Sequence, residues 1–252
     1  MDQYNDMYSQ QRDQQPAYGY SGAAAYENEM TLSAYVGKIM RRVFGKMTLG
    51  ILLTAIISML VASNTSMMLT IFQHSWMMWG LIIAQLAVVL ILSARINKMS
   101  ASTASVMFYL YALLTGVTLT PIFVVYSGDA IVRTFFITAA TFGIMAAFGY
   151  VTKKDLSRFG SILFMVLIGL IVVTLVNLFL KSTMLDWVIS LVGVAVFIGL
   201  TAWDTQKIKQ MAAETVGAEN VSKVATLGAL ELYLDFINLF LYLLRIFGGS
   251  RN

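Results

Sequence analysis

The chain lacks the residues from which many soluble catalytic and metal sites are built. It contains no cysteine and a single histidine, His74, in 252 residues. Disulfides, thiol chemistry, cysteine-ligated metals and histidine-rich metal sites are therefore excluded, and we expect no cofactor. Charged residues make up only 12% of the chain, hydrophobic residues make up 58%, and the mean hydropathy is +0.75. A soluble domain of this length could not cover its surface with so few polar groups, so we expect a protein embedded in the lipid bilayer.

Long apolar runs account for most of the sequence. Seven of them approach the roughly 20 residues that a membrane-spanning helix needs. They cover approximately 47–63, 75–94, 101–126, 133–151, 159–180, 185–205 and 227–247. The run 81–92 is apolar on every face, whereas the strands of a membrane barrel alternate apolar and polar residues. We therefore predict an all-α polytopic membrane protein with seven transmembrane helices in one domain, 35–252, in which Pro121 kinks the third helix.

The first 34 residues differ from the rest. They are rich in Gln, Tyr, Asn and Ser and contain no apolar stretch of the kind found in a cleaved signal peptide. We expect residues 1–34 to form a disordered polar tail on the cytoplasmic side.

The basic residues predict how the chain is oriented. The net charge is +4, but the Lys and Arg residues lie in short clusters between the apolar runs, which argues against a nucleic-acid surface. With seven crossings, thirteen of the seventeen fall on the side of the amino terminus, which predicts a cytoplasmic amino terminus. The last segment leaves two alternatives open, because a full crossing puts Arg245 and Arg251 outside and a re-entrant hairpin keeps them inside.

Two aspartates lie inside apolar segments near the end of the chain. Asp204 lies about one turn inside the predicted cytoplasmic boundary of the sixth segment, and Asp235 lies roughly 12 Å inside the seventh at 1.5 Å per residue. An ionised group at such a depth costs several kcal/mol unless it is paired, hydrated or protonated. Two neighbouring carboxylates cannot both stay ionised cheaply, so the pair should titrate as a unit, sense pH and hold a divalent cation such as calcium.

Two further charged residues belong to this hypothesis. Glu231 lies one turn before Asp235 on the same helix face and extends the acidic lining. Arg95, at the cytoplasmic end of the second segment, is the expected counter-charge for Asp204 and would close the site by a salt bridge that protonation loosens. The alternative is that Asp204 caps a helix end in the headgroup layer and that Arg95 is one more positive charge on the cytoplasmic side.

Three stretches of sequence resemble one known family. The string Leu-Tyr-Leu-Asp-Phe-Ile-Asn-Leu-Phe-Leu at 232–241, followed by Leu243, Leu244 and Arg245, is similar to the last helix of the Bax inhibitor-1 (transmembrane BAX inhibitor motif) family. The strings Asp-Thr-Gln-Lys-Ile at 204–208 and Lys-Lys-Asp-Leu-Ser at 153–157 add to the match. The resemblance covers about residues 35 to 248 and indicates a bacterial member.

The resemblance implies a fold in which the last helix is central and is wrapped by the other six as two groups of three. It also implies a pH-sensitive calcium leak whose paired-aspartate sensor falls on Asp204 and Asp235 and whose arginine latch falls near Arg95. Where some members carry an acid in the middle of helix two, this chain has Gln85, which can bond in a pore but supplies no charge.

Beyond the aspartate pair, three polar side chains are candidates for lining a pore. These are Glu231, Gln85 and Asn238. Together with the aspartates they predict a calcium or cation leak in the inner membrane.

Three alternatives to the leak are an intramembrane protease, a secondary transporter and a non-conducting regulator. An intramembrane aspartyl protease would carry Gly-x-Gly-Asp at its second aspartate, whereas Asp235 follows Tyr-Leu, so we expect no enzyme. A secondary transporter would show an inverted repeat, and none is clear. The remaining alternative is a non-conducting regulator that binds other membrane proteins, such as a quality-control protease, in keeping with the cytoprotective role from which the family is named.

Overall fold

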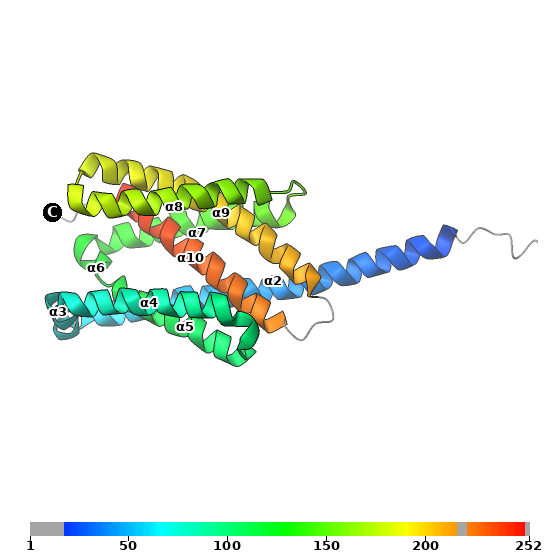
Figure 1. Cartoon of the computed structure of the whole chain (residues 1–252), viewed down its shortest axis with the longest axis horizontal. Coiled ribbons are helices and arrows are strands. Elements are labelled where there is room, and N and C mark those ends of the chain that lie inside the picture. The colour runs from blue at the N-terminus through cyan, green and yellow to red at the C-terminus, as the bar shows by residue number, and fades with distance from the viewer. Residues whose placement is uncertain (1–17, 216–220, 250–252) are drawn as a thin grey trace, which may run out of the picture.

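The computed structural model describes residues 18–215 and 221–249, and within these ranges the chain forms helices joined by short turns, with no strand (Figure 1). Seven spans are long and apolar enough to cross a membrane, as predicted. The long helices are α2 (Tyr18–Ser63), α4 (Ser75–Arg95), α5 (Ala101–Thr118), α7 (Gly128–Val151), α8 (Ser157–Leu180), α9 (Thr183–Glu214) and α10 (Val221–Phe247). Short helices α3 (Thr65–Gln73), η1 (Ile96–Lys98) and α6 (Ile122–Val125) lie between them.

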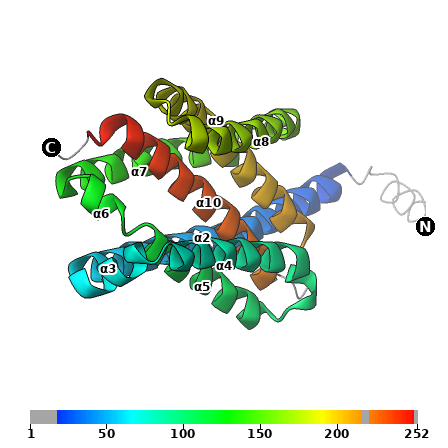
Figure 2. The ribbon, with the colours of Figure 1, turned by 60° about the vertical axis from the view of Figure 1, so that its left-hand side comes forward.

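The last helix, α10, forms the centre of the bundle. In its most apolar window 67% of the residues are buried, against 6–33% in the other six spans. It packs against α2, α5, α7 and α9, while α4 packs on α5 and α8 packs on α9. Figures 1 and 2 show α10 running obliquely between α2, α4 and α5 on one side and α7, α8 and α9 on the other. The predicted central helix and its two groups of three are confirmed.

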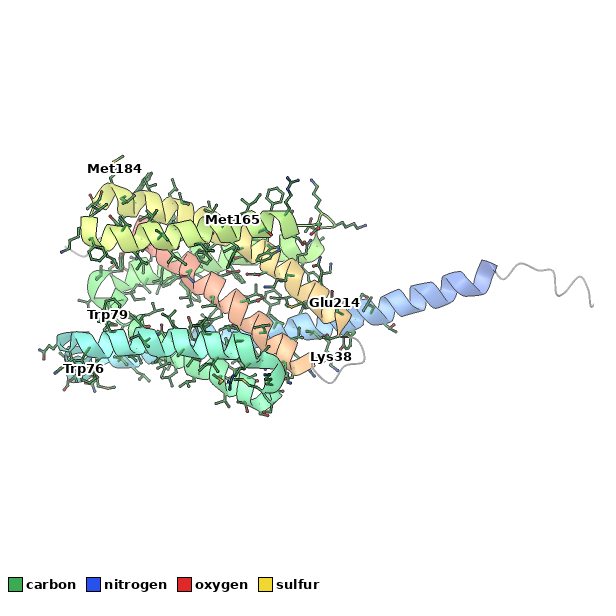
Figure 3. The ribbon with its side chains drawn as sticks, in the orientation of Figure 1. Lys38, Trp76, Trp79, Met165, Met184 and Glu214 are labelled. Atoms are coloured by element: carbon green, nitrogen blue, oxygen red, sulfur yellow. The ribbon has the colours of Figure 1, made fainter. Side chains whose placement is uncertain are left out.

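The outer surface of the bundle is apolar. Met165 and Met184 project outward from α8 and α9, and Trp76 and Trp79 project from the first turns of α4 (Figure 3). Trp76 and Met184 lie at the end of the bundle opposite Lys38 and Glu214. Such an outer face has no soluble environment that suits it, so it contacts lipid.

The last helix crosses the whole bundle. α10 is unbroken over 27 residues, about 40 Å at 1.5 Å per residue. Near its end, Arg245 Nη1 lies 3.2 Å from Oδ1 of Asp186, which belongs to the first turn of α9. Since α9 runs from that end back to Lys207, Arg245 and Lys207 lie at opposite ends of the bundle. Of the two alternatives left open by the sequence, the structure has the full crossing.

Two helix boundaries differ from the expected ones. α2 begins at Tyr18 and passes without interruption through residue 35, where the membrane domain was expected to begin, so 18–34 are helical instead of disordered. Residues 1–17 of the expected tail lie outside the described residues. The helix α9 runs on to Glu214, although the apolar segment ends near 205. An existing helix lengthens without a new nucleation cost, and in α9 the added turns are also held by contacts with the loop before α8 and with α10.

Pro121 breaks the third span, in line with the predicted kink. The helix α5 ends at Thr118 and α6 begins at Ile122, after the proline. The carbonyl of Val117, which Pro121 leaves without its usual donor, accepts from the N–H of Thr120 at 3.3 Å, and the Thr120 hydroxyl donates to Gly116 O at 3.3 Å. The carbonyls freed by the break are therefore partly satisfied within the membrane, as spanning segments require.

Glycines bring α9 close to its two neighbours. A Cβ on Gly149 of α7 would overlap the backbone carbonyl of Ala202, and a Cβ on Gly160 of α8 would overlap the ring of Trp203. Both contacts fall on the turn of α9 directly before Asp204. These glycines thus fix the position of the turn that carries the first aspartate.

Candidate functional site

The structure brings Asp204 and Asp235 together at the contact between α9 and α10. Their side chains face one another across this contact, near enough to interact electrostatically. Asp204 is 8% exposed and Asp235 is 4% exposed, so both are removed from water. Asp235 occupies the middle of α10, the most buried helix of the protein. Two buried carboxyl groups this near one another cannot both stay ionised without a cost in free energy, which a proton or a cation removes.

Lys207 joins the two aspartates to a third acid. Its Nζ lies 2.7 Å from Glu231 Oε1 and 3.4 Å from Asp204 Oδ1. The same ammonium group lies 5.1 Å from the centre of the Trp203 ring, a cation–π distance. We call Asp204, Lys207, Glu231 and Asp235 the acid cluster. It links one turn of α9 to two successive turns of α10.

The acid cluster has more negative than positive charge available to it. Three carboxyl groups face one ammonium group, and Glu231 Oε2 and Asp235 Oδ2 are buried without a hydrogen-bond partner among the described residues. A buried carboxylate oxygen without a partner is costly, and the cost disappears when a proton or a cation is bound. The cluster is therefore chemically suited to exchange protons or cations.

The cluster is not a ready-made metal site in this arrangement. Within the described ranges, no three Asp, Glu, His or Cys side chains converge in the way that would hold a metal ion. Calcium takes six to eight oxygen ligands, and here Lys207 occupies the place next to two of the carboxyl groups. Binding of calcium by Asp204 and Asp235 thus requires Lys207 to move away.

Arg95, the expected counter-charge, lies elsewhere. It is exposed at the last turn of α4, and the structure gives it no hydrogen bond or ion pair with any described residue. Its position suits a cation at a helix carboxyl end and at the basic end of the bundle. The cation that pairs with Asp204 in the structure is Lys207 and not Arg95. The sequence carries a signal for this pair, since Lys207 follows Asp204 by three residues, but Lys207 lies beyond the apolar segment that ends near 205.

The two polar pore candidates have partners outside the acid cluster. Gln85 Nε2 donates to the Thr118 hydroxyl at 2.7 Å and joins α4 to the end of α5. Asn238 Nδ2 donates to Leu234 O at 2.8 Å, within its own helix. Of the three candidates for lining a pore, Glu231 alone belongs to the acid cluster, through its ion pair with Lys207.

A second residue that sequence reasoning missed fixes the loop before α8. The Gln206 side chain accepts from the N–H of Leu156 at 2.8 Å and donates to Lys154 O at 2.8 Å. In the same loop, hydrogen bonds from the Ser157 hydroxyl and N–H lower the pKa of the exposed Asp155 below its usual value. The loop is therefore held to α9 by Gln206, which lies two residues after Asp204, and the carboxyl group of Asp155 stays ionised.

Six outer spans around a central seventh, with a buried acid cluster at the contact between α9 and α10, define a polytopic α-helical membrane protein with an ionisable core. The model of the family described as inhibitor of apoptosis-promoting Bax1 matches residues 36–252, and the chain belongs to this Bax inhibitor-1 family.

The relatives fit the same assignment. The inner membrane protein YbhL of Escherichia coli strain K12 is 51% identical over 214 residues, which cover 84% of this chain and 92% of YbhL. An uncharacterized protein of Borreliella burgdorferi is 43% identical over 216 residues, 85% of this chain and 93% of that protein. The uncharacterized protein RP147 of Rickettsia prowazekii is 43% identical over 217 residues, with 85% and 91% covered. With its seven spans, this chain is a multi-pass inner membrane protein.

Proposed function

We propose that this protein is a pH-sensitive leak for calcium or other cations, in which Asp204 and Asp235 hold either a proton or the ion. The observation that carries the proposal is the excess of carboxyl groups over ammonium groups in the buried acid cluster. Intramembrane acids of this kind are costly and are found mostly on proton and ion paths. A proton or a cation that binds to a cluster with two unpartnered oxygens lowers its free energy.

The state of Lys207 links pH to the ion site in this proposal. At low pH the carboxyl groups are neutral, the attraction that holds Lys207 weakens, and calcium has no charged ligand to bind. As the pH rises the carboxyl groups ionise, and Lys207 and calcium then compete for the carboxylates. Cation binding should therefore strengthen with rising pH.

Orientation places the site on one side of the membrane. The basic residues at the end of the bundle near Lys207 outnumber those near Arg245, so this end faces the cytoplasm by the positive-inside rule. The acid cluster then lies in the cytoplasmic half, and the amino terminus is cytoplasmic.

A second function has an observation in its favour. Lys207 already bonds two of the three acids, and the side chains form no ready-made metal site within the described residues. Such a cluster also suits a non-conducting regulator that binds other membrane proteins, in which the ion pairs only hold α9 to α10. We expect no enzymatic activity in either case.

Calcium flux into proteoliposomes distinguishes the two functions. The parent protein, Asp235→Asn and the control Asp186→Asn would be assayed near pH 6 and near pH 8 after each is shown to be monodisperse. Asp186 is a suitable control because it is half-exposed and pairs with Arg245 at the other end of the bundle. We expect a pH-dependent flux in the parent and in Asp186→Asn, and loss of the pH dependence in Asp235→Asn.

Absence of flux from the folded parent at both pH values would refute the leak and favour the regulator. A pH-dependent flux that survives in Asp235→Asn would show that protons are sensed elsewhere.

A further inference from the structure

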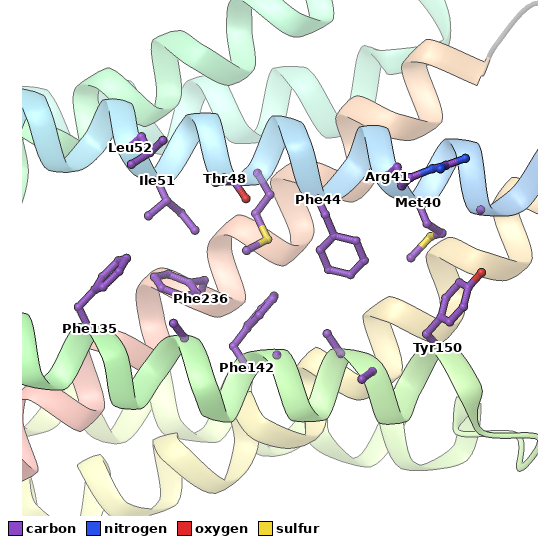
Figure 4. Close-up of a pocket in the computed structure, with 16 residues that line it drawn as sticks. Met40, Arg41, Phe44, Thr48, Ile51, Leu52, Phe135, Phe142, Tyr150 and Phe236 are labelled. Atoms are coloured by element: carbon purple, nitrogen blue, oxygen red, sulfur yellow. The ribbon is translucent and has the colours of Figure 1, made fainter.

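A long apolar groove runs between α2 and α7, with α10 as its floor (Figure 4). Its volume is about 690 Å³, well within the range of small-molecule sites. Side chains of Phe44 and Ile51 from α2, Phe135 and Phe142 from α7, and Phe236 from α10 line it. The groove is thus a gap between the two groups of three helices, on the side of α10 that neither group covers.

The groove opens sideways toward the bilayer. Leu52 on α2 and Gly143 and Ala147 on α7 line it and are themselves exposed. At membrane depth, an opening lined in this way gives access to lipid and not to water.

One end of the groove is polar and positively charged. Arg41 and Tyr150 lie together at that end, while Phe135 lies at the other (Figure 4). Beyond Tyr150 there is a second cavity of about 770 Å³, which shares Tyr150 with the groove. Polar and charged side chains line this second cavity, among them Lys153, Lys209 and Asp155.

The charges of this end favour an anion. Three cationic side chains, Arg41, Lys153 and Lys209, face one carboxylate, Asp155. Arg41 is exposed, and Lys209 donates to the backbone carbonyl of Tyr150 at 2.7 Å, which holds its ammonium group beside the junction. The excess is positive, and Lys153 and Asp155 lie in the turn between the spans α7 and α8, a position at which a spanning protein meets lipid headgroups.

We propose that the groove and the adjoining cavity bind one anionic phospholipid of the bilayer, with an acyl chain between α2 and α7 and the phosphate beside Arg41 and Lys209. The match is one of shape and polarity: an apolar cavity and a polar cavity meet at Tyr150, as the chain and headgroup of a phospholipid meet at its glycerol. Arg41 supplies a planar donor pair that suits a phosphate. This site is independent of the proposed cation leak, because no residue of the acid cluster lines it.

Native mass spectrometry of the full chain in detergent tests the headgroup contact. The protein would be mixed with phosphatidylglycerol or with phosphatidylethanolamine of the same chain length, and retained lipid would be counted. We expect one phosphatidylglycerol retained several-fold more often than phosphatidylethanolamine, and an Arg41→Gln variant that loses this preference. Arg42→Gln is the matched control, because Arg42 is the next residue on α2, is also exposed and lines neither cavity.

A second pair of variants tests the groove without changing charge. Neither Gly143 nor Gly169 has a side-chain or neighbouring-helix atom within 4 Å of an added Cβ, so both sites accept a larger side chain. Gly143 lines the groove and Gly169 lies on α8 outside it. We expect Gly143→Phe to abolish phosphatidylglycerol retention and Gly169→Phe to leave it unchanged.

Three results would overturn the proposal. In the first, the parent retains both lipids equally or retains neither. In the second, Arg41→Gln and Arg42→Gln have equal effects. In the third, Gly143→Phe retains phosphatidylglycerol as well as the parent does.

Discussion

Replacing Lys207 by glutamine should destabilise the protein in a pH-dependent way. The substitution removes the one ammonium group that the acid cluster has among the described residues, which leaves Asp204, Glu231 and Asp235 facing one another. Glutamine keeps most of the side-chain length, so the change is mainly one of charge. The helix itself should be unaffected, because glutamine and lysine have similar helix propensities.

The magnitude follows from the burial of the partners. Removing one member of a buried ion pair costs about 3–5 kcal/mol. The side chain of Lys207 is 34% exposed, whereas the side chains of Asp204 and Glu231 are 11% and 22% exposed, so water screens part of the interaction. We therefore expect a loss of about 2 kcal/mol near pH 8. At about 2–4 °C per kcal/mol for a chain of this size, the melting temperature should fall by about 4–8 °C.

Acidification should remove most of this loss. The carboxylates that Lys207 neutralises become neutral themselves as they bind protons, so near pH 5 the variant and the parent should melt within about 2 °C of each other. Thermal unfolding in detergent, followed by loss of the monodisperse fraction, measures both values. Lys209→Gln is the control, since Lys209 contacts the backbone of Tyr150 and the face of its ring. Its effect should be the same at both pH values.

Two outcomes would refute this account of the cluster. One is an equal loss at both pH values in Lys207→Gln, which would mean that the lysine acts through packing and not through charge. The other is no loss at either pH, which would mean that the carboxyl groups are already neutral in the parent.

Two further substitutions test how the site is positioned. Gly149→Ala should lower the melting temperature by several degrees, because its methyl group would lie 2.8 Å from the Ala202 carbonyl carbon and push α7 away from α9, at a cost of about 1–3 kcal/mol. Gly143→Ala on the same helix is the control, since its methyl group meets nothing within 4 Å and should be neutral or slightly stabilising. Equal melting temperatures of the two variants would contradict this. Gln206→Leu should release the loop 152–156, seen as severalfold faster hydrogen exchange there with the rest of α7 and α8 unchanged, and unchanged exchange in the loop would show that the two Gln206 hydrogen bonds do not hold it.

The sequence predicts the architecture well because the membrane reduces the choices. A spanning segment has to be an apolar helix, and seven such segments were visible as uninterrupted runs. The break at Pro121 followed from the missing N–H. The extent of α9 beyond residue 205 did not follow, because polar residues there pack against the loop before α8 and against α10. Hydropathy does not register such contacts.

The candidate site was predictable in part for the same reason. Depth alone singled out Asp204 and Asp235, and helix spacing added Glu231. The sequence does not identify the cation that pairs with Asp204, because Arg95 and Lys207 lie at the same end of the bundle and Lys207 lies outside the apolar segment that carries Asp204. Which of them reaches the acids depends on how α9 is rotated toward α10, and a single sequence does not encode that rotation in any readable pattern.

The position of α10 also has a consequence for biosynthesis. It is the last of the seven spans to leave the ribosome, yet it is the helix against which α2, α5, α7 and α9 pack. Until it is inserted, those helices lie in the bilayer with lipid in place of their common partner, and the turn of α9 that carries Asp204 and Lys207 has neither Glu231 nor Asp235 beside it. The two groups of three helices can pack within themselves before α10 arrives, but they meet one another mainly through it, so joining them is the step that waits for α10.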